Sequence, residues 1–149
     1  MLMKTHMAIG VFAVIFFFPY MNNKAIFSLA VLIASLLPDV DSGFSTMGRN
    51  MVMKPLQVLT RHRGIFHSFT FCIVVSLFFS FYLPVLAFGF FLGYALHLLA
   101  DSWTPEGIKP FWPLKNDLMG KVRVGGVIEE TVFIVFAILD VIFFILLFV

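Results

Sequence analysis

The chain has 149 residues, of which 61% are hydrophobic, 17% are aromatic and only 12% are charged. A soluble domain carries about 25% charged residues, and the mean hydropathy of +1.04 leaves too little polar surface to cover a soluble fold. This composition excludes a soluble enzyme and predicts an integral membrane protein of one domain. The net charge of +2 gives no reason to expect a nucleic-acid partner, and the single cysteine, Cys72, excludes an intrachain disulfide.

Five apolar stretches predict five membrane-crossing helices, because a crossing helix needs about 17–25 mostly apolar residues. Their expected ranges are about 3–18, 24–37, 64–82, 85–101 and 127–149, with polar loops at about 39–63 and 102–126. The first stretch lacks a clear small-x-small cleavage site, so it is interpreted as a retained helix rather than a signal peptide. The expected fold is an all-α, polytopic membrane helical bundle that forms a single domain over residues 1–149.

Basic residues are distributed unevenly over this topology. Five crossings place the N-terminus and both long loops on one side of the membrane. That side holds Lys4, Arg49, Lys54, Arg61, Arg63, Lys109, Lys115, Lys121 and Arg123. The other side holds only Lys24. Because cytoplasmic loops are enriched in Lys and Arg, the N-terminus and both loops are expected in the cytoplasm.

His97 and Asp101 lie four positions apart in an apolar stretch and therefore share one face of the predicted helix. Ionisable residues in such a stretch are energetically costly and are by default candidates for function. Three other predicted helices bring polar residues to the same membrane face: His6, Asp39, Asp41, His62 and His67. All four histidines of the chain and three of its five aspartates gather there.

Histidine and carboxylate ligands in this number suit Zn²⁺, and also Mn²⁺ or Fe. The expected metal ligands are His6, Asp39, His62, His67, His97 and Asp101, which would hold one or two ions. The absence of cysteine among them fits a catalytic ion better than a structural zinc site. A catalytic ion keeps one position open for water and lowers the pKa of that water.

Other residues near these positions have expected roles in catalysis. Asp39 or Asp41 would orient or deprotonate the water, if it is not itself a ligand. Arg63 is expected at the start of the third helix, where its guanidinium and the helix-end amides favour a phosphate. Ser68 and Thr104 would hydrogen-bond the ligands or the substrate.

Simpler interpretations of the same residues remain open, because polar residues are ordinary at the ends of membrane helices. His97 and Asp101 would also form a hydrogen-bonded pair without metal, and Asp41 would cap a turn. Glu129 and Glu130 begin the fifth predicted helix, where the helix dipole favours acidic residues, although either would also serve as a further ligand.

Asp140 lies inside the fifth predicted helix and has no partner that the sequence reveals. An intramembrane carboxylate is usually functional or paired. Its role is left unassigned.

The polar motifs follow one another in a specific order. They are Lys4-Thr5-His6, LPDVD at residues 37–41, HRGIFHS at 62–68, and His97-x-x-x-Asp101-x-x-Thr104-x-x-Gly107. This series resembles the YdjM/YbcI family over about residues 5–113. The resemblance implies a metal-dependent hydrolase in the inner membrane of a bacterium or archaeon. More distantly, the order is similar to the zinc-dependent phospholipase C and nuclease group, but the later His-x-x-x-Glu ligands of that group are missing, which disfavours a three-zinc cluster.

The expected function is a membrane-embedded metal-dependent hydrolase. A metal-bound hydroxide would attack an ester or phosphodiester of a lipid or lipid-linked substrate at the cytoplasmic interface. An ion or small-solute transporter is one alternative, although the far halves of the first four helices are nearly all apolar. A non-catalytic membrane protein that a metal stabilises is the other.

Overall fold

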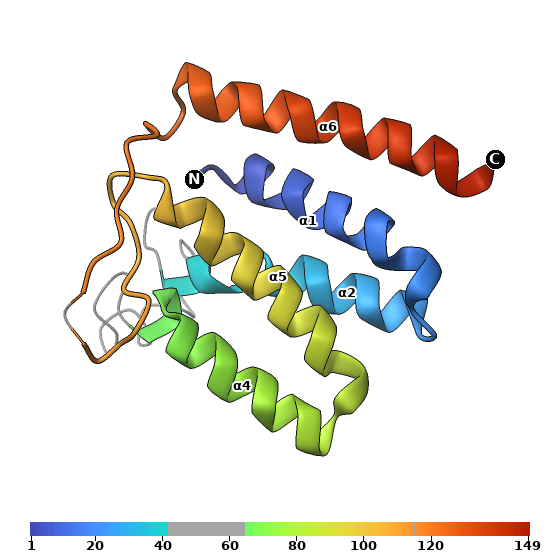
Figure 1. Cartoon of the computed structure of the whole chain (residues 1–149), viewed down its shortest axis with the longest axis horizontal. Coiled ribbons are helices and arrows are strands. Elements are labelled where there is room, and N and C mark those ends of the chain that lie inside the picture. Colours follow the sequence, from blue (N-terminus) through green and yellow to red (C-terminus); the bar gives the residue numbers. More distant parts are fainter. Residues whose placement is uncertain (42–64, 115) are drawn as a thin grey trace.

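The computed structural model describes residues 1–41, 65–114 and 116–149 (Figure 1). Within these residues the predicted all-α class is confirmed, since the structure has helices and no strand. The α-helices are α1 (Met3–Phe17), α2 (Lys24–Ala34), α4 (Phe69–Tyr82), α5 (Pro84–Ser102) and α6 (Val127–Phe148). The 3-10 helices are η1 (Phe18–Tyr20) after α1, η2 (Leu37–Asp41) after α2, and η4 (Ile65–His67) before α4.

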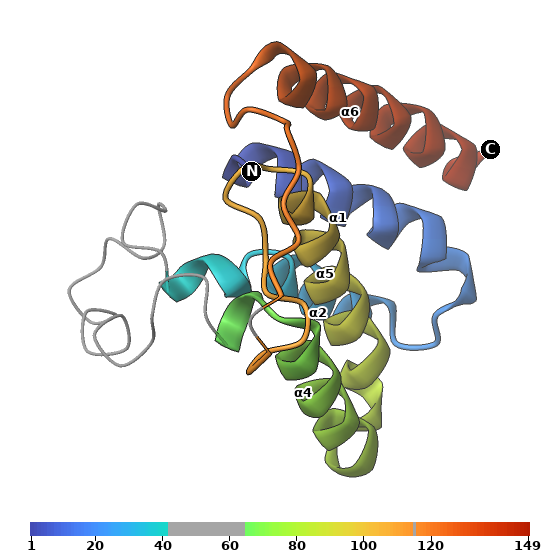
Figure 2. The same cartoon turned by 60° about the vertical axis from the view of Figure 1, so that its left-hand side comes forward.

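The helices form a bundle with α5 near its centre. α5 packs against α1, α2 and α4, whereas α6 packs mainly against α1. Figures 1 and 2 show α6 along one edge and α4 along the opposite edge, with α1, α2 and α5 between them. The N-terminus and the segments at 103–114 and 116–126 lie at one end of the bundle, and the C-terminus lies at the other end. Which end faces the cytoplasm stays a prediction.

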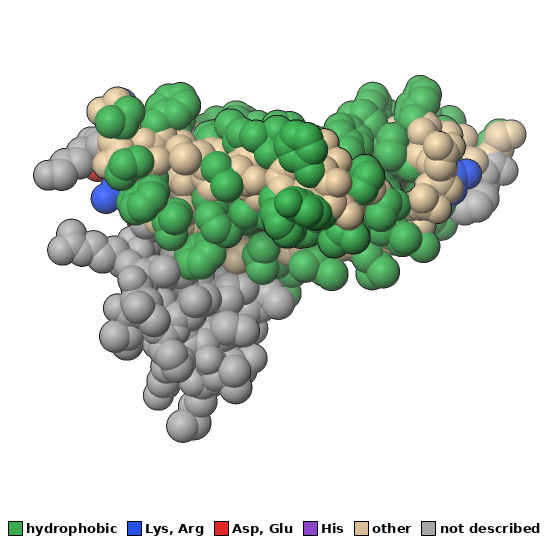
Figure 3. Space-filling model, turned by 90° about the horizontal axis from the view of Figure 1, so that it is seen from below, with side chains coloured by type: hydrophobic (Ala, Val, Ile, Leu, Met, Phe, Trp, Pro, Cys, Tyr) green, Lys and Arg blue, Asp and Glu red, His purple; other side chains and the backbone are tan. Residues whose placement is uncertain are grey.

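Among the residues that the structure describes, three helical segments are long and apolar enough to cross a membrane: Met3–Tyr20, Pro84–Ser102 and Val127–Leu147. α2 and α4 have 11 and 14 residues. At 1.5 Å per residue they are only about 16–21 Å long, shorter than a hydrocarbon core of roughly 30 Å. The five expected crossings therefore correspond to three full-length segments and two shorter helices. Hydrophobic side chains dominate the face seen in Figure 3, and Lys and Arg side chains are visible at its two ends.

Two helices are shorter than the apolar stretches that predicted them. α2 stops at Ala34 rather than near residue 37, because Pro38 has no backbone N–H to donate to the Ala34 carbonyl oxygen. α4 begins at Phe69 rather than near residue 64. The Ser68 hydroxyl accepts a hydrogen bond from the Phe71 amide (3.1 Å) and so acts as the N-cap of α4.

α2 and α5 approach closely because two glycines of α5 face α2. A Cβ atom on Gly93 would lie 2.2 Å from the Val31 carbonyl oxygen, and one on Gly89 would lie 2.9 Å from the Ala30 Cβ. Small residues at such positions let two helix backbones approach, as is common between membrane helices. No larger residue fits at Gly93 unless the α2 backbone moves.

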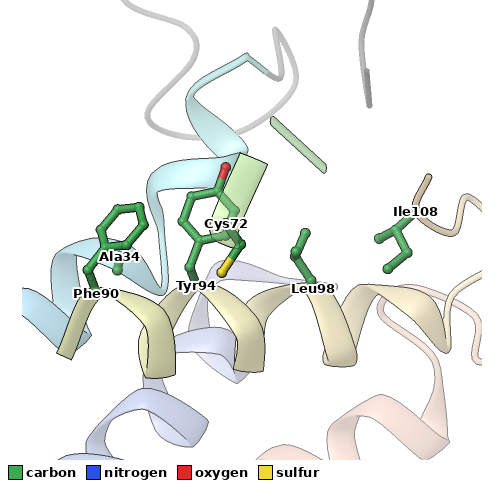
Figure 4. Packing of buried hydrophobic residues seen from close by; sticks show 6 residues of the cluster. All are labelled: Ala34, Cys72, Phe90, Tyr94, Leu98 and Ile108. Atoms are coloured by element: carbon green, nitrogen blue, oxygen red, sulfur yellow. The ribbon is translucent and has the colours of Figure 1, made fainter. Parts of the chain in front are cut away.

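A different face of α5 carries Phe90, Tyr94 and Leu98, which follow one another at intervals of one helical turn. They form a buried hydrophobic cluster with Ala34, Cys72 and Ile108 (Figure 4). This cluster joins α2, α4 and the segment after α5 to the central helix. Cys72 is fully buried there as a small packing residue.

Candidate metal centre

The face of α5 that carries Gly89 and Gly93 continues with His97 and Asp101, each one further turn along the helix. α2 runs beside this face in a constant register. The contacting pairs are Phe27–Gly89, Val31–Gly93 and Ser35–His97, each separated by 62 positions in the chain. The same separation brings Asp39 of η2 to the level of Asp101. The glycine contacts thus set which polar groups meet at the end of the bundle.

Four side chains from η2, η4 and α5 form a compact group, which we term the Asp/His cluster: Asp39, His67, His97 and Asp101. One ligand atom of each lies within 4.8 Å of those of the others. Asp101 Oδ2 is 3.6 Å from Nε2 of both histidines, and Asp39 Oδ1 is 3.9 Å from the same two nitrogens. Both histidines and Asp101 are buried, whereas the Asp39 side chain is 18% exposed.

The spacing in the Asp/His cluster suits a shared metal ion. Zinc binds nitrogen and oxygen ligands at about 2.0–2.2 Å, so neighbouring ligand atoms of a tetrahedral site lie about 3.3–3.6 Å apart. Charge-assisted hydrogen bonds between nitrogen and oxygen are shorter, about 2.7–2.9 Å. The two distances of 3.6 Å match this spacing and the two of 3.9 Å lie slightly above it, and all four are longer than a charge-assisted hydrogen bond.

The orientation of the His97 ring also favours metal binding. Its Nδ1 lies 2.7 Å from the Ser35 carbonyl oxygen. A carbonyl only accepts, so Nδ1 carries the hydrogen, and in the neutral ring Nε2 presents a lone pair to the Asp/His cluster. This Nε2 is buried and makes no hydrogen bond within the described part of the chain.

His6 of α1 lies directly against the Asp/His cluster. Its ring stacks on that of His97, with 3.9 Å between centroids and 13° between planes. Its Nε2 is 3.3 Å from Asp101 Oδ1, an oxygen that the Met1 amino group also contacts. Both ring nitrogens of His6 are buried without a hydrogen bond to the described residues. His6 is thus placed on the second oxygen of Asp101, where it could bind the same ion or another.

His67 is held in place by groups around its backbone. The Lys109 amide donates to the His67 carbonyl oxygen (3.1 Å), and the Tyr94 hydroxyl donates to the Phe66 carbonyl oxygen (2.6 Å). The Ser68 hydroxyl donates to the first carbonyl of η4 (2.6 Å) while it caps α4. Ser68 therefore bonds to backbone on both sides and fixes the segment that carries His67.

Thr104 follows α5 and is fully buried. Its hydroxyl donates to the Asp101 carbonyl oxygen (2.8 Å), and its own carbonyl accepts hydrogen bonds from the amides of Gly107 (3.1 Å) and Gly120 (2.9 Å). Thr104 thus ties the segment after α5 to the helical turn that carries Asp101.

Three residues expected at the site cannot be placed. His62 and Arg63 lie outside the described residues, as does the side chain of Asp41. Their roles as metal ligand, phosphate-binding group and water-activating group stay predictions.

Glu129 is fully buried, and its carboxylate oxygens are occupied by protein donors. It accepts hydrogen bonds from the Leu2 amide (2.5 Å), the Thr5 hydroxyl (3.0 Å) and the Gly125 amide (2.6 Å). Glu130 forms an exposed ion pair with a lysine of α1 (2.5 Å). These contacts show that both glutamates join α6 to the N-terminal end of α1, a role that needs no metal ion.

Asp140 lies 13 residues beyond the start of α6, which at 1.5 Å per residue is about 20 Å into the membrane-crossing helix. Phe12 of α1 packs edge-on against Phe136 and Phe143, on either side of it along the helix, with 5.4 Å between ring centroids in each pair. The Asp140 Oδ1 atom is buried without a hydrogen bond to any described residue. Asp140 is only partly buried and therefore lies among apolar side chains in the middle of α6, away from the Asp/His cluster.

The Ser35 carbonyl and Gly93 contribute to the site but carry no recognisable chemistry in the sequence. A backbone carbonyl gives no residue signature, and a glycine in an apolar stretch has many uses. The available signal was the four-residue spacing of Gly89, Gly93, His97 and Asp101, which places all of them on one helix face.

A family model described as YdjM inner membrane protein matches residues 1–149 of the chain. Similar curated proteins include the inner membrane protein YdjM of Escherichia coli and that of Shigella flexneri, each 34% identical over 97 residues, covering 58% of this chain and 48% of the relative. The uncharacterized protein YvsG of Bacillus subtilis is 32% identical over 85 residues, covering 54% of this chain and 53% of the relative. The chain spans about half the length of the curated relatives it matches. No solved structure matches it.

Proposed function

The chain belongs to the YdjM family of inner membrane proteins, and we propose that it is a membrane-embedded metal-dependent hydrolase. Its substrate is an ester or phosphodiester of a lipid or lipid-linked molecule, which it cleaves at the cytoplasmic membrane interface. The observation that carries this proposal is the Asp/His cluster at one end of the bundle.

The composition of the Asp/His cluster supports binding of a divalent cation. Two carboxylates and two neutral imidazoles provide two negative charges, which a divalent cation neutralises. The Met1 amino group contacts one oxygen of the buried Asp101 carboxylate, and a divalent cation at the other oxygen would add to this compensation. Zinc fits this donor set best, with Mn or Fe as alternatives. His6 on the outer oxygen of Asp101 extends the set, so one or two ions are proposed.

An ion bound there would polarise the ester or phosphoryl oxygen and lower the pKa of a bound water. His67 and His97 would hold it, and the Ser35 carbonyl would keep the His97 ring in the tautomer that metal binding requires. Asp39 is the partly exposed member of the Asp/His cluster and is best placed to accept a proton from water. Arg63 and Asp41 are proposed to bind phosphate and to assist with the water.

The distribution of buried polar side chains supports an interfacial enzyme rather than a transporter. In the described part of the chain they are Thr5, His6, Ser35, His67, Ser68, His97, Asp101, Ser102, Thr104 and Glu129. All lie at helix ends or loops on the side of the Asp/His cluster. A transport path needs polar groups that continue through the membrane. The buried residues of the other half are apolar, and Asp140, the carboxylate that departs from this pattern, is only partly buried.

The degree of burial favours a second candidate function, in which a bound metal ion joins the helices and has no catalytic role. His67, His97 and Asp101 are at most 1% exposed, as in a closed structural site. A closed site has four protein ligands, whereas a catalytic site keeps one position for water. X-ray absorption spectroscopy of the metal-loaded protein distinguishes the two, because only the catalytic site includes a water oxygen.

The decisive experiment combines elemental analysis of the purified protein with hydrolysis assays on phospholipids and lipid-linked phosphates in vesicles. We expect one or two equivalents of metal, and hydrolysis that a chelator abolishes and added zinc restores. The variants His97→Ala and Asp101→Ala should lose both metal and activity. Asp117→Asn, an exposed carboxylate at the same end, is the matched control and should keep both. Activity that survives in the two cluster variants would overturn the proposal.

A further inference from the structure

The segment after α5 presents an apolar tip to the outside of the molecule. Phe111, Trp112 and Leu114 are 57%, 40% and 60% exposed. The Leu114 amide bonds to the Phe111 carbonyl oxygen (2.8 Å), which closes the tip as a turn. Exposed apolar side chains in one short turn mark a binding surface rather than an ordinary loop. We refer to residues 111–114 as the loop tip.

The loop tip is fastened to the bundle from both sides. Ile108 and Leu118 form a two-way backbone bridge (2.9 Å for each hydrogen bond), and Ile108 is buried in the hydrophobic cluster of α5. The Pro110 carbonyl accepts hydrogen bonds from the amides of Phe69 (2.9 Å) and Thr70 (3.3 Å) at the start of α4. The position of the tip is therefore set by the first turn of α4.

The outer surface of α4 shows what surrounds the loop tip. Most of its exposed side chains are apolar: Ile73, Val74, Leu77, Phe78 and Phe81. The exposed polar residues Ser80 and Tyr82 lie at the end of α4 that is far from the loop tip. In a membrane protein such a face contacts lipid acyl chains. The first turn of α4 is the end of this lipid-facing surface, so the tip beside it lies at the level where acyl chains meet headgroups.

The exposed tyrosine and tryptophan side chains lie at the two ends of the bundle. Tyr20 and Tyr82 end η1 and α4 at one end, whereas Trp103 and Trp112 lie at the end of the Asp/His cluster. The 19 residues of α5 between these levels span about 28 Å, close to the hydrocarbon thickness of roughly 30 Å. Trp and Tyr side chains gather at the two interfaces of a bilayer.

We propose that the loop tip is a membrane anchor immersed in the phospholipid headgroup region, where it sets the depth of the Asp/His cluster. Lys109 directly precedes the tip and bonds through its amide to the His67 carbonyl oxygen (3.1 Å). The partner of the tip is the phospholipid of the surrounding bilayer. The short connection from Lys109 to His67 holds this histidine at the same headgroup level.

Tryptophan fluorescence tests this placement, because the chain contains only two tryptophans. The variant Trp103→Phe leaves Trp112 as the single reporter, and Trp112→Phe leaves Trp103. Each protein is reconstituted in phosphatidylcholine vesicles that contain lipid brominated near the headgroup or near the chain end. We expect blue-shifted Trp112 emission that loses most of its intensity with the shallow bromolipid and little with the deep one.

The opposite outcome is red-shifted Trp112 emission that aqueous iodide quenches and bromolipid does not. It would overturn the anchor and assign the tip to water or to a cytoplasmic protein. A positive control replaces both tryptophans with phenylalanine and adds Tyr20→Trp, which reports on the other interface. A thermal unfolding curve equal to that of the parent protein establishes that each variant is folded.

A second measurement links the tip to catalysis and rests on the proposed function. The variant Phe111→Ser/Leu114→Ser should lower hydrolysis of a vesicle-bound lipid and leave hydrolysis of a soluble short-chain analogue unchanged. Equal loss on both substrates would contradict a role in reaching the bilayer. Shallow quenching without hydrolysis in any variant would support the anchor and reject the hydrolase, so the two failures are distinguishable.

Discussion

Asp101 and Glu129 are both fully buried carboxylates, and both lie near the N-terminal end of α1. Glu129 receives hydrogen bonds of 2.5–3.0 Å from two backbone amides and one hydroxyl. Asp101 faces three imidazole nitrogens at 3.3–3.6 Å and the amino group of Met1. Backbone amides and the hydroxyl donate hydrogen bonds to the Glu129 carboxylate, whereas imidazole nitrogens can bind the same cation as the Asp101 carboxylate.

This difference shows that burial alone does not identify a functional carboxylate. Glu129 is buried because it joins α6 to the start of α1, and its neighbours supply all the compensation that its charge needs. Asp101 is buried among groups that can themselves act as ligands. The identity of the neighbours, rather than the burial of the acid, distinguishes a structural link from a candidate metal site.

The largest expected effect is loss of metal on substitution at the Asp/His cluster. Asp101→Asn keeps the shape of the side chain but removes its charge, so metal affinity should fall by more than about 100-fold, since even the loss of an outer hydrogen-bond partner costs 10–100-fold. Titration with zinc and elemental analysis measure the change. The protein with the matched substitution Glu129→Gln should keep the metal at the Asp/His cluster. Equal loss of metal in both variants would contradict the different roles assigned to the two carboxylates.

The next effect concerns stability. Glu129→Ala leaves three donors without their acceptor, each worth about 1–3 kcal/mol, so the thermal unfolding temperature should fall by several degrees while metal stoichiometry stays constant. Glu130→Ala is the control, because its exposed ion pair contributes only about 0–1 kcal/mol. An unchanged unfolding temperature for Glu129→Ala would show that the three hydrogen bonds do not stabilise the fold.

A smaller effect is expected from a residue that touches no ligand. Gly93→Ala places a Cβ atom 2.2 Å from the Val31 carbonyl oxygen, which is too close for a non-bonded contact. The substitution therefore moves α2 away from α5. The hydrogen bond between His97 and the Ser35 carbonyl should weaken, and metal affinity should fall about 10–100-fold. Gly89→Ala is the control one turn further from the site. A larger loss for Gly89→Ala would contradict the proposed register.

The smallest effect is expected in the middle of α6. Asp140→Leu removes a carboxyl oxygen that is buried without a hydrogen bond among the described residues. Replacement by an apolar side chain should raise the free energy of unfolding by about 1 kcal/mol, seen as a modest rise in unfolding temperature in detergent with no change in metal content. A fall in stability instead would reveal a partner for Asp140 in the membrane.

Some features of this protein follow directly from the order of its residues. Long apolar stretches can satisfy their backbone hydrogen bonds in lipid only as helices, so the membrane location and the all-α class were predictable. Four-residue spacing is a local property of a helix, so the shared face of His97 and Asp101 was predictable as well. Ser68 was also visible as a polar residue before an apolar run, although its role as a helix cap was not inferred.

The tertiary structure decided which polar residues meet and what each one contacts. The contact of Gly93 with Val31 sets the register of α2 on α5, and this register brings Asp39 and the Ser35 carbonyl to His97. The packing of α6 against α1 places the Glu129 carboxylate beside the Leu2 amide and the Thr5 hydroxyl. A sequence specifies periodicity within one helix. The distance between atoms on different helices depends on how closely their backbones pack, and that is set by side-chain volumes at the contact.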